Sequence, residues 1–177
     1  MLTTITDNHA MVRVAFLALT ALMLTAPAGA QQCRLCYSDP AAKEGEPPLG
    51  IEIWADLNFS KLALTGRDGG SAELPATGGG KRTSGSMIDL GGVAVAGHGK
   101  ITGAPGREVR VELPTQVDMT SADGGHAELV GFATDLPPHP VLNARGELEF
   151  NFGARLVLRS GTGGNLRGRI PISVDYN

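Results

Sequence analysis

The two cysteines carry the most specific chemistry in this sequence. Cys33 and Cys36 are the only cysteines among 177 residues, and their spacing is C-x-x-C. In an oxidising compartment this pair favours a disulfide, either within the chain or with another chain. A redox-active pair is one alternative, and it needs a helix N-terminus in a thioredoxin-like setting. A zinc site is the other alternative, and it needs two further ligands.

The other polar residues do not form a recognisable catalytic or metal-binding set. Glu147 and Glu149 alternate with apolar residues, so we expect them on one solvent face of a strand rather than facing each other across a groove. Residues 78–83 (GGGKRT) lack two positions of the phosphate-binding loop, and they predict a basic, solvated turn. Three histidines fall in separate predicted turns: His98, His126 and His139. We therefore expect a protein that is not an enzyme, with no catalytic residues, no metal and no cofactor.

The amino-acid composition indicates what kind of domain carries these candidate residues. The chain has 15 Lys and Arg against 18 Asp and Glu, a net charge of −3, so no nucleic acid or other polyanionic partner is predicted. Its 42% hydrophobic content is sufficient for one buried core. Glycine contributes 25 residues, roughly twice ordinary usage, without a collagen period. These features indicate a single globular domain with many turns.

The first 30 residues have the pattern of a secretory signal peptide. Arg13 precedes an apolar run over residues 14–24, and residues 28–30 (AGA) fit the cleavage site. The ten residues before Met11 contain no Lys or Arg, so Met11 is predicted to be the initiator. The apolar run is too short to anchor the chain in a bilayer. We expect a signal helix that is removed after Ala30, and a mature chain without an integral membrane segment.

The mature chain divides into two parts. Residues 31–50 are polar and Pro-rich and contain the C-x-x-C pair, whereas residues 51–177 show short runs of alternating apolar residues between Gly, Asp and Ser turns. This pattern predicts an all-β fold, a single antiparallel β-sandwich of immunoglobulin-like or pilin-like type. The clearest runs are 51–55, 93–95, 109–113, 117–119, 148–152 and 170–176.

Five segments of the predicted β domain resemble a known family. They are LNF at 57–59, ITGAPGREVRVELPTQVDMT at 101–120, GGHAELVGFAT at 124–134, LNARGELEFNFGARLVL at 142–158 and GTGGNLRGRIPISVDYN at 161–177. In order and spacing they resemble the bacterial secreted domain-of-unknown-function family 4402. The resemblance implies export across the inner membrane, to the periplasm, the outer surface or the medium. It also implies a β-sandwich loosely similar to spore-coat-protein-U-type and chaperone–usher pilin-type subunits. The chain departs from the family at Leu166, where an aromatic residue is usual.

The C-terminal strand is the predicted assembly surface. Pilin-type subunits end in an alternating apolar strand with a penultimate aromatic residue and a Gly fourteen places from the end. In this chain the matching residues are Gly164, Ile170, Ile172, Val174 and Tyr176. Such a strand can border a groove that another chain fills by β-strand addition. Pro171 fits this role only if its missing N–H faces outward from the sheet.

These observations favour a non-enzymatic, secreted structural or adhesive subunit of a cell-surface or pilus-like assembly. Its expected partners are a periplasmic chaperone or like subunits, bound by β-strand addition. The N-terminal segment offers only Cys33, Leu35 and Tyr37 as alternating apolar residues, which is short for a donor strand. One alternative is a monomeric periplasmic or extracellular ligand-binding module. A second alternative is a redox or metal protein that uses Cys33 and Cys36.

Overall fold

The computed structural model describes residues 45–159 and 164–177, which lie in the compact unit Ser38–Asn177. Every regular element of these residues is a β-strand and every strand pair is antiparallel, which confirms the predicted all-β class. Within the same residues no helix is long and apolar enough to cross a membrane. The predicted signal helix, Met11, Cys33 and Cys36 lie outside the described residues.

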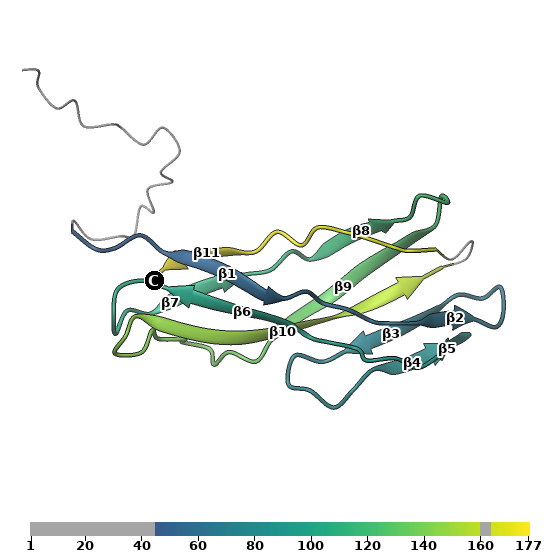
Figure 1. Cartoon of the computed structure of the whole chain (residues 1–177), viewed down its shortest axis with the longest axis horizontal. Helices are drawn as coiled ribbons and strands as arrows, with labels where there is room; N and C mark the ends of the chain where they lie inside the picture. The colour runs from purple at the N-terminus through teal and green to yellow at the C-terminus, as the bar shows by residue number, and fades with distance from the viewer. Residues whose placement is uncertain (1–44, 160–163) are drawn as a thin grey trace, which may run out of the picture. The chain divides into compact units, whose positions relative to one another are not determined.

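Eleven strands are described, and Figure 1 labels them in chain order. They are β1 (Gly50–Ala55), β2 (Leu62–Leu64), β3 (Gly70–Leu74), β4 (Arg82–Gly85), β5 (Met87–Asp89), β6 (Gly97–Thr102), β7 (Val109–Glu112), β8 (Gln116–Thr120), β9 (His126–Thr134), β10 (Glu147–Leu158) and β11 (Ser173–Tyr176).

The long strand β10 organises the largest sheet. Its first half pairs with β6 and its second half with β3, so these two strands follow one another along one edge of β10. Strand β9 pairs with the opposite edge. Strands β1, β4 and β8 then pair with the outer edges of β6, β3 and β9 (Figure 1). This arrangement places β1 and β8 at opposite ends of one strand order.

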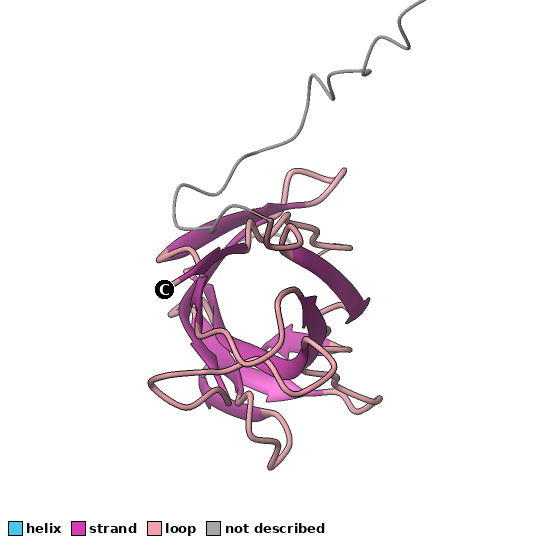
Figure 2. Ribbon diagram, turned by 90° about the vertical axis from the view of Figure 1, so that its left-hand side faces the viewer, coloured by secondary structure: helices cyan, strands magenta, loops and turns pink. Residues whose placement is uncertain are grey.

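The C-terminal segment extends that order beyond β8. Strand β11 pairs with β7, and further back along the chain Arg167 forms an isolated bridge with Thr120, at the end of β8. Seen end-on, the strands surround a common interior (Figure 2). The order therefore begins at β1 and ends at the C-terminal segment, and we call the boundary between these two ends the seam. Neither end has a strand paired along the seam among the described residues.

The interior contains two apolar clusters, and β10 contributes to both. Leu156 and Ala154 belong to one cluster, whereas Phe150 and Phe152 belong to the other. Leu57 and Ile170 are partly buried and pack against both clusters. The largest fully buried side chains are Phe150, Ile101, Leu142 and Val109. The two segments that border the seam are therefore joined to the same core.

Two glycines of β6 make room for the aromatic rings of β10. Gly97 lies directly opposite Phe152, and Gly99 lies opposite Phe150. A Cβ atom on Gly97 would stand 2.1 Å from Cζ of Phe152, and one on Gly99 would stand 2.8 Å from Cε1 of Phe150. The rings therefore lie across the bare backbone of β6, a pairing that also fixes strand register. Part of the glycine excess thus serves packing rather than turns.

Two sequence-based expectations about strands are wrong. Val93 and Val95 do not form a strand, because Gly91 and Gly92 before them have positive φ, which extended backbone does not allow. Val93 is 80% exposed, and Val95 makes an isolated bridge with Asn58. The last ladder begins at Ser173 rather than at Ile170. The alternation of apolar side chains nevertheless continues through residues 170–172, which is why sequence pattern alone placed them in the strand.

Candidate functional site: a groove along the seam

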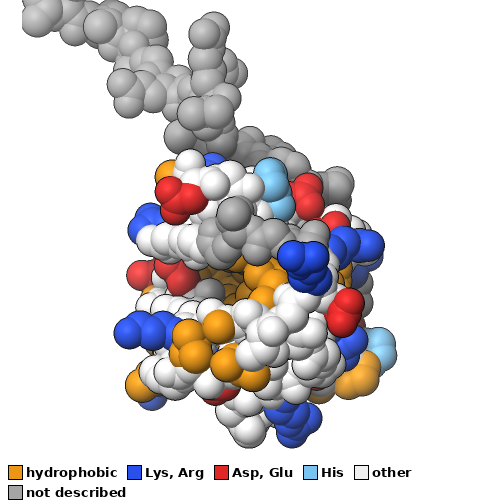
Figure 3. All heavy atoms as spheres, turned by 90° about the vertical axis from the view of Figure 1, so that its right-hand side faces the viewer, with side chains coloured by type: hydrophobic (Ala, Val, Ile, Leu, Met, Phe, Trp, Pro, Cys, Tyr) orange, Lys and Arg blue, Asp and Glu red, His pale blue; other side chains and the backbone are white. Residues whose placement is uncertain are grey.

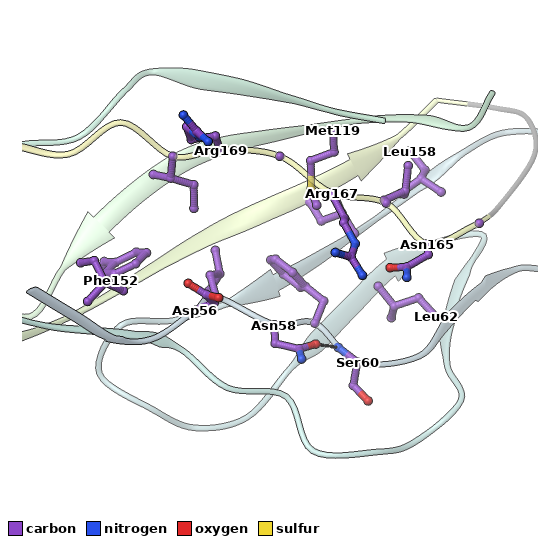
Figure 4. A pocket seen from close by; sticks show the side chains of 18 of the residues that line it. Asp56, Asn58, Ser60, Leu62, Met119, Phe152, Leu158, Asn165, Arg167 and Arg169 are labelled. Carbon is purple, nitrogen blue, oxygen red and sulfur yellow. Dashed lines mark hydrogen bonds between the residues drawn. The ribbon is translucent and has the colours of Figure 1, made fainter. Parts of the chain in front are cut away.

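A groove of about 760 Å³ opens along the seam. Residues 53–62 form one wall and residues 164–172 form the other (Figure 4). The floor is apolar and includes Leu62, Met119, Phe152, Leu156 and Leu158. Figure 3 shows apolar side chains within a hollow at the end of the domain that lies at the right of Figure 1. The groove therefore gives solvent access to the core.

The first wall is held firmly by backbone hydrogen bonds. Asn58 and Val95 exchange two N–H···O bonds of 2.8 Å. The Asn58 side chain accepts a 2.7 Å bond from the amide of Ser60, the one non-glycine residue with positive φ in the described chain, at 59°. Local side-chain bonding of this kind stabilises such a turn. The Ser60 hydroxyl also donates to Gly91 O at 3.1 Å.

Lys81 stabilises the same wall by hydrogen bonds to its backbone. Its side chain is only 3% exposed, so the predicted solvated turn at residues 78–83 is wrong at this position. The ammonium donates to Phe59 O at 2.9 Å and to Lys61 O at 3.2 Å, and it pairs with Asp89 at 2.6 Å. These three acceptors match the three N–H donors of a lysine, which explains how the charge is accommodated. The Lys81 hydrogen bond, with a second from Gly91 N, holds the pKa of Asp89 below its ordinary value.

The second wall has the alternation expected of a strand. Leu166, Ile170 and Ile172 are partly buried against the core, whereas Arg167 and Arg169 are exposed. Arg167 exchanges backbone bonds of 2.9 and 3.0 Å with Thr120, which attaches the segment to β8. The wall thus places apolar side chains in the groove, and Figure 4 shows the Arg167 side chain extending across its opening toward Asn58 and Ser60.

Residues 168–172, the part of the second wall between the Arg167 bridge and β11, differ from its ends in their hydrogen bonding. Among the described residues, no hydrogen bond reaches the backbone of residues 168–172. The amides of Arg167 and Asn177 point toward β8 and β7, where they donate to Thr120 O and Glu108 O. Successive amides of an extended chain point to opposite edges, so the N–H groups of even-numbered residues point toward the seam. Pro171 has the odd parity, so its missing donor lies on the side of β7 and β8 and not outward from the sheet, as the sequence-based role required; the seam-facing residues 168, 170 and 172 all keep their N–H groups.

The seam is closed at its other end by Tyr176. The Tyr176 hydroxyl donates to Pro47 O at 2.8 Å and accepts from the buried amide of Ala104 at 2.8 Å. Its ring lies 4.9 Å beneath the guanidinium of Arg107. Beyond this contact β1 has an open edge: Ile51 and Ile53 lie opposite inward-facing residues of β6 yet are 41% and 40% exposed. Among residues 45–159 and 164–177 no strand pairs with this edge of β1, which accounts for their exposure.

The structure brings together some of the residues selected from sequence. Gly164, Ile170 and Ile172 line the groove, whereas Val174 and Tyr176 lie in the paired strand β11. The part of the first wall that follows β1, residues 56–62, and its anchor Lys81 were missed, since neither has an apolar alternation that distinguishes it from a loop. His98, His126 and His139 are separate, and in the described part of the chain no three metal-ligating side chains gather.

A family model described as "Domain of unknown function (DUF4402)" matches residues 49–176. The chain belongs to this family. The DUF4402 match contains both walls of the groove, from just before β1 to Tyr176, and excludes Cys33 and Cys36. Neither a curated protein nor a solved structure was found to match the chain. The groove is therefore a feature of the DUF4402 domain itself rather than of the segment that precedes it.

Proposed function

We propose that this chain is a secreted, non-enzymatic β-sandwich subunit of a cell-surface or pilus-like assembly. In this proposal the groove accepts an extended strand from a periplasmic chaperone or a neighbouring subunit. The observation that carries the proposal is the second wall: residues 168–172 are aligned with the groove and have no backbone hydrogen-bond partner among the described residues. An unpaired edge of this kind is a template for strand addition.

The groove also specifies the chemistry of the incoming strand. Apolar side chains at alternate positions would cover Phe152, Leu156 and Leu158, as strand alternation requires. The intervening side chains would point outward, beside Arg167 and Arg169. Acidic residues at those outward positions are favoured, because opposite charges on neighbouring strands contribute about 0.2–1 kcal/mol per pair. We infer a donor strand that alternates apolar and acidic or polar residues.

A pair of substitutions at Ile170 tests the proposal. Ile170→Pro removes the amide that points into the seam, whereas Ile170→Ala removes the same apolar side chain and keeps that amide. Each full-length variant is expressed in a bacterium that assembles the wild-type protein, and its assembly is measured by gel filtration of the envelope extract. We expect Ile170→Ala to assemble and Ile170→Pro to remain monomeric. Equal assembly of the two folded variants would contradict strand addition.

A ligand-binding module is the second candidate, because the groove volume and its apolar floor fall within the range of small-molecule sites. In that case the protein from its native envelope would carry an apolar ligand that solvent extraction releases. Mass spectrometry of the extract would detect it, and the Ile170→Pro variant would still bind it because a small ligand does not need a backbone ladder. These outcomes distinguish the ligand from the strand.

A further inference from the structure

A second surface with unassigned chemistry lies on the outer face of β1, β6 and β10. This face points away from the core, because the inward positions of β6 are taken by Gly97, Gly99 and Ile101. The outward side chains are Glu52, Trp54, His98, Lys100, Glu149 and Asn151. Glu52, Lys100 and Glu149 lie directly opposite one another across the three strands. We call these six residues the outer polar face.

Trp54 is the central apolar group of the outer polar face. It occupies a register shift between Ile53 and Ala55, where the strand bulges and re-aims a side chain. The indole is 48% exposed. Two neighbours nevertheless hold it in place. The Trp54 and His98 ring centroids are 5.4 Å apart with an interplanar angle of 49°, and the Lys100 ammonium lies 5.6 Å from the Trp54 ring centroid. The chain thus presents an ordered aromatic surface to solvent.

Hydrogen-bonding groups beside Trp54 are fixed in orientation. Asn151 donates to Asp135 through Nδ2 at 2.6 Å, so its Oδ1 accepts from His98 Nδ1 at 2.8 Å. This bond places a proton on His98 Nδ1, so that Nε2 is the acceptor in the neutral ring. Glu149 lies 3.8 Å from that Nε2, too far for a direct hydrogen bond. Two acceptors therefore stand close together beside the exposed indole without bonding each other.

We propose that the outer polar face binds a neutral saccharide ring. The indole of Trp54 stacks against the apolar C–H face of the saccharide. His98 Nε2 and the Glu149 carboxylate accept hydrogen bonds from the saccharide hydroxyl groups. Charge selects against acidic glycans, because on and around this face four carboxylates outnumber the cations Lys100 and Arg145. Those carboxylates are Glu52, Asp135, Glu147 and Glu149. Together with strand addition through the groove, the site would make the subunit adhesive.

Intrinsic fluorescence gives a direct test, since Trp54 is the only tryptophan of the chain. The mature protein is titrated with cellohexaose, chitohexaose and mannohexaose as neutral probes, and with oligogalacturonate and heparin hexasaccharide as anionic ones. We expect at least one neutral probe to give a saturable change in Trp54 emission, with Kd below about 10 mM. No saturable change with any neutral probe, or tighter binding of the anionic probes, would overturn the proposal.

Variants then assign the binding to the named residues, with calorimetry replacing fluorescence. Trp54→Ala is expected to weaken binding of the neutral probe by roughly tenfold or more, and Glu149→Ala by severalfold. Val141→Ala removes another half-exposed apolar side chain, outside the outer polar face, and is the matched control, with unchanged affinity expected. Unchanged affinity in a folded Trp54→Ala protein would overturn the site. Trp54→Ala should leave assembly through the groove intact, which separates this proposal from the proposed function.

Discussion

The hydroxyl of Tyr176 joins the two ends of the domain by donating to the backbone carbonyl of Pro47, 129 residues earlier in the chain, at 2.8 Å. The same oxygen accepts from the amide of Ala104. A penultimate aromatic residue therefore has a structural task here, because it closes the seam at one end. The groove begins where this closure stops, beside Ile172 and Ile53.

Removal of this hydroxyl should loosen the closed end of the seam. Tyr176→Phe keeps the ring in the core but leaves the buried amide of Ala104 without its acceptor. An unsatisfied buried donor costs about 1–3 kcal/mol. We expect the free energy of unfolding, measured by urea titration, to fall by that amount. A change below about 0.5 kcal/mol would show that water replaces the hydroxyl at Ala104.

Lys81 should be a stabilising residue rather than a surface charge. Lys81→Met fills similar space but removes the donors to Phe59 O and Lys61 O, which belong to the first wall of the groove. We expect the melting temperature to fall by roughly 5–10 °C. Lys61→Met, which removes an exposed ammonium from the same wall, is the control and should change it little. Equal effects of the two variants would contradict the assigned role.

The Asp89 ion pair predicts a specific pH dependence. The pKa of Asp89 is lowered from its ordinary 3.8, so its ionised form is favoured by folding. Its contribution to stability is therefore present above pH 3.8 and is lost as the pH falls through the lower pKa of the folded state. We expect Asp89→Asn to lower the melting temperature at pH 7, and the difference from wild type to shrink below pH 3.8. A difference that is constant from pH 7 to pH 2 would contradict this interpretation.

Gly97 should resist even a methyl group. Gly97→Ala places a Cβ where the Phe152 ring now lies, at 2.1 Å from Cζ. The ring must move, and such overpacking costs about 1–3 kcal/mol of folding free energy. Phe152→Leu in the same background should recover part of that cost, because the smaller side chain leaves room for the methyl group. Additive effects in this double-mutant cycle would show that Gly97 and Phe152 are not coupled.

Sequence alone predicted the parts of the fold that depend on alternation. The antiparallel all-β class and the inward positions of Phe150, Phe152 and Ile172 follow from a period of two, which any half-buried strand must have. Sequence did not predict that Lys81 is buried, since two of its three acceptors are backbone carbonyls with no side-chain signature and the third, Asp89, lies outside the GGGKRT turn. It also began the last strand at Ile170 rather than at Ser173, because alternation reports which face is covered and not where a ladder begins.

The same limit applies to the candidate site. Gly164, Ile170 and Ile172 could be selected because their types and spacing match the C-terminal strand of pilin-type subunits, which borders a groove that another chain fills. The wall around Asn58 and Ser60 could not, because it depends on a turn at positive φ and on a bridge to Val95, 37 residues away. The exposure of Ile51 and Ile53 likewise depends on the edge of β1 having no paired strand in the described part of the chain, which no local pattern reports.

The central claim is that the seam accepts a strand along residues 168–172, and amide hydrogen exchange tests it most directly. The measurement compares the peptide covering these residues in protein extracted as an assembly from its native envelope and in the same protein refolded alone. Our account predicts that exchange of this peptide is much slower in the assembly, while the already paired strand β10 is unchanged. Equally fast exchange of residues 168–172 in both samples would contradict it.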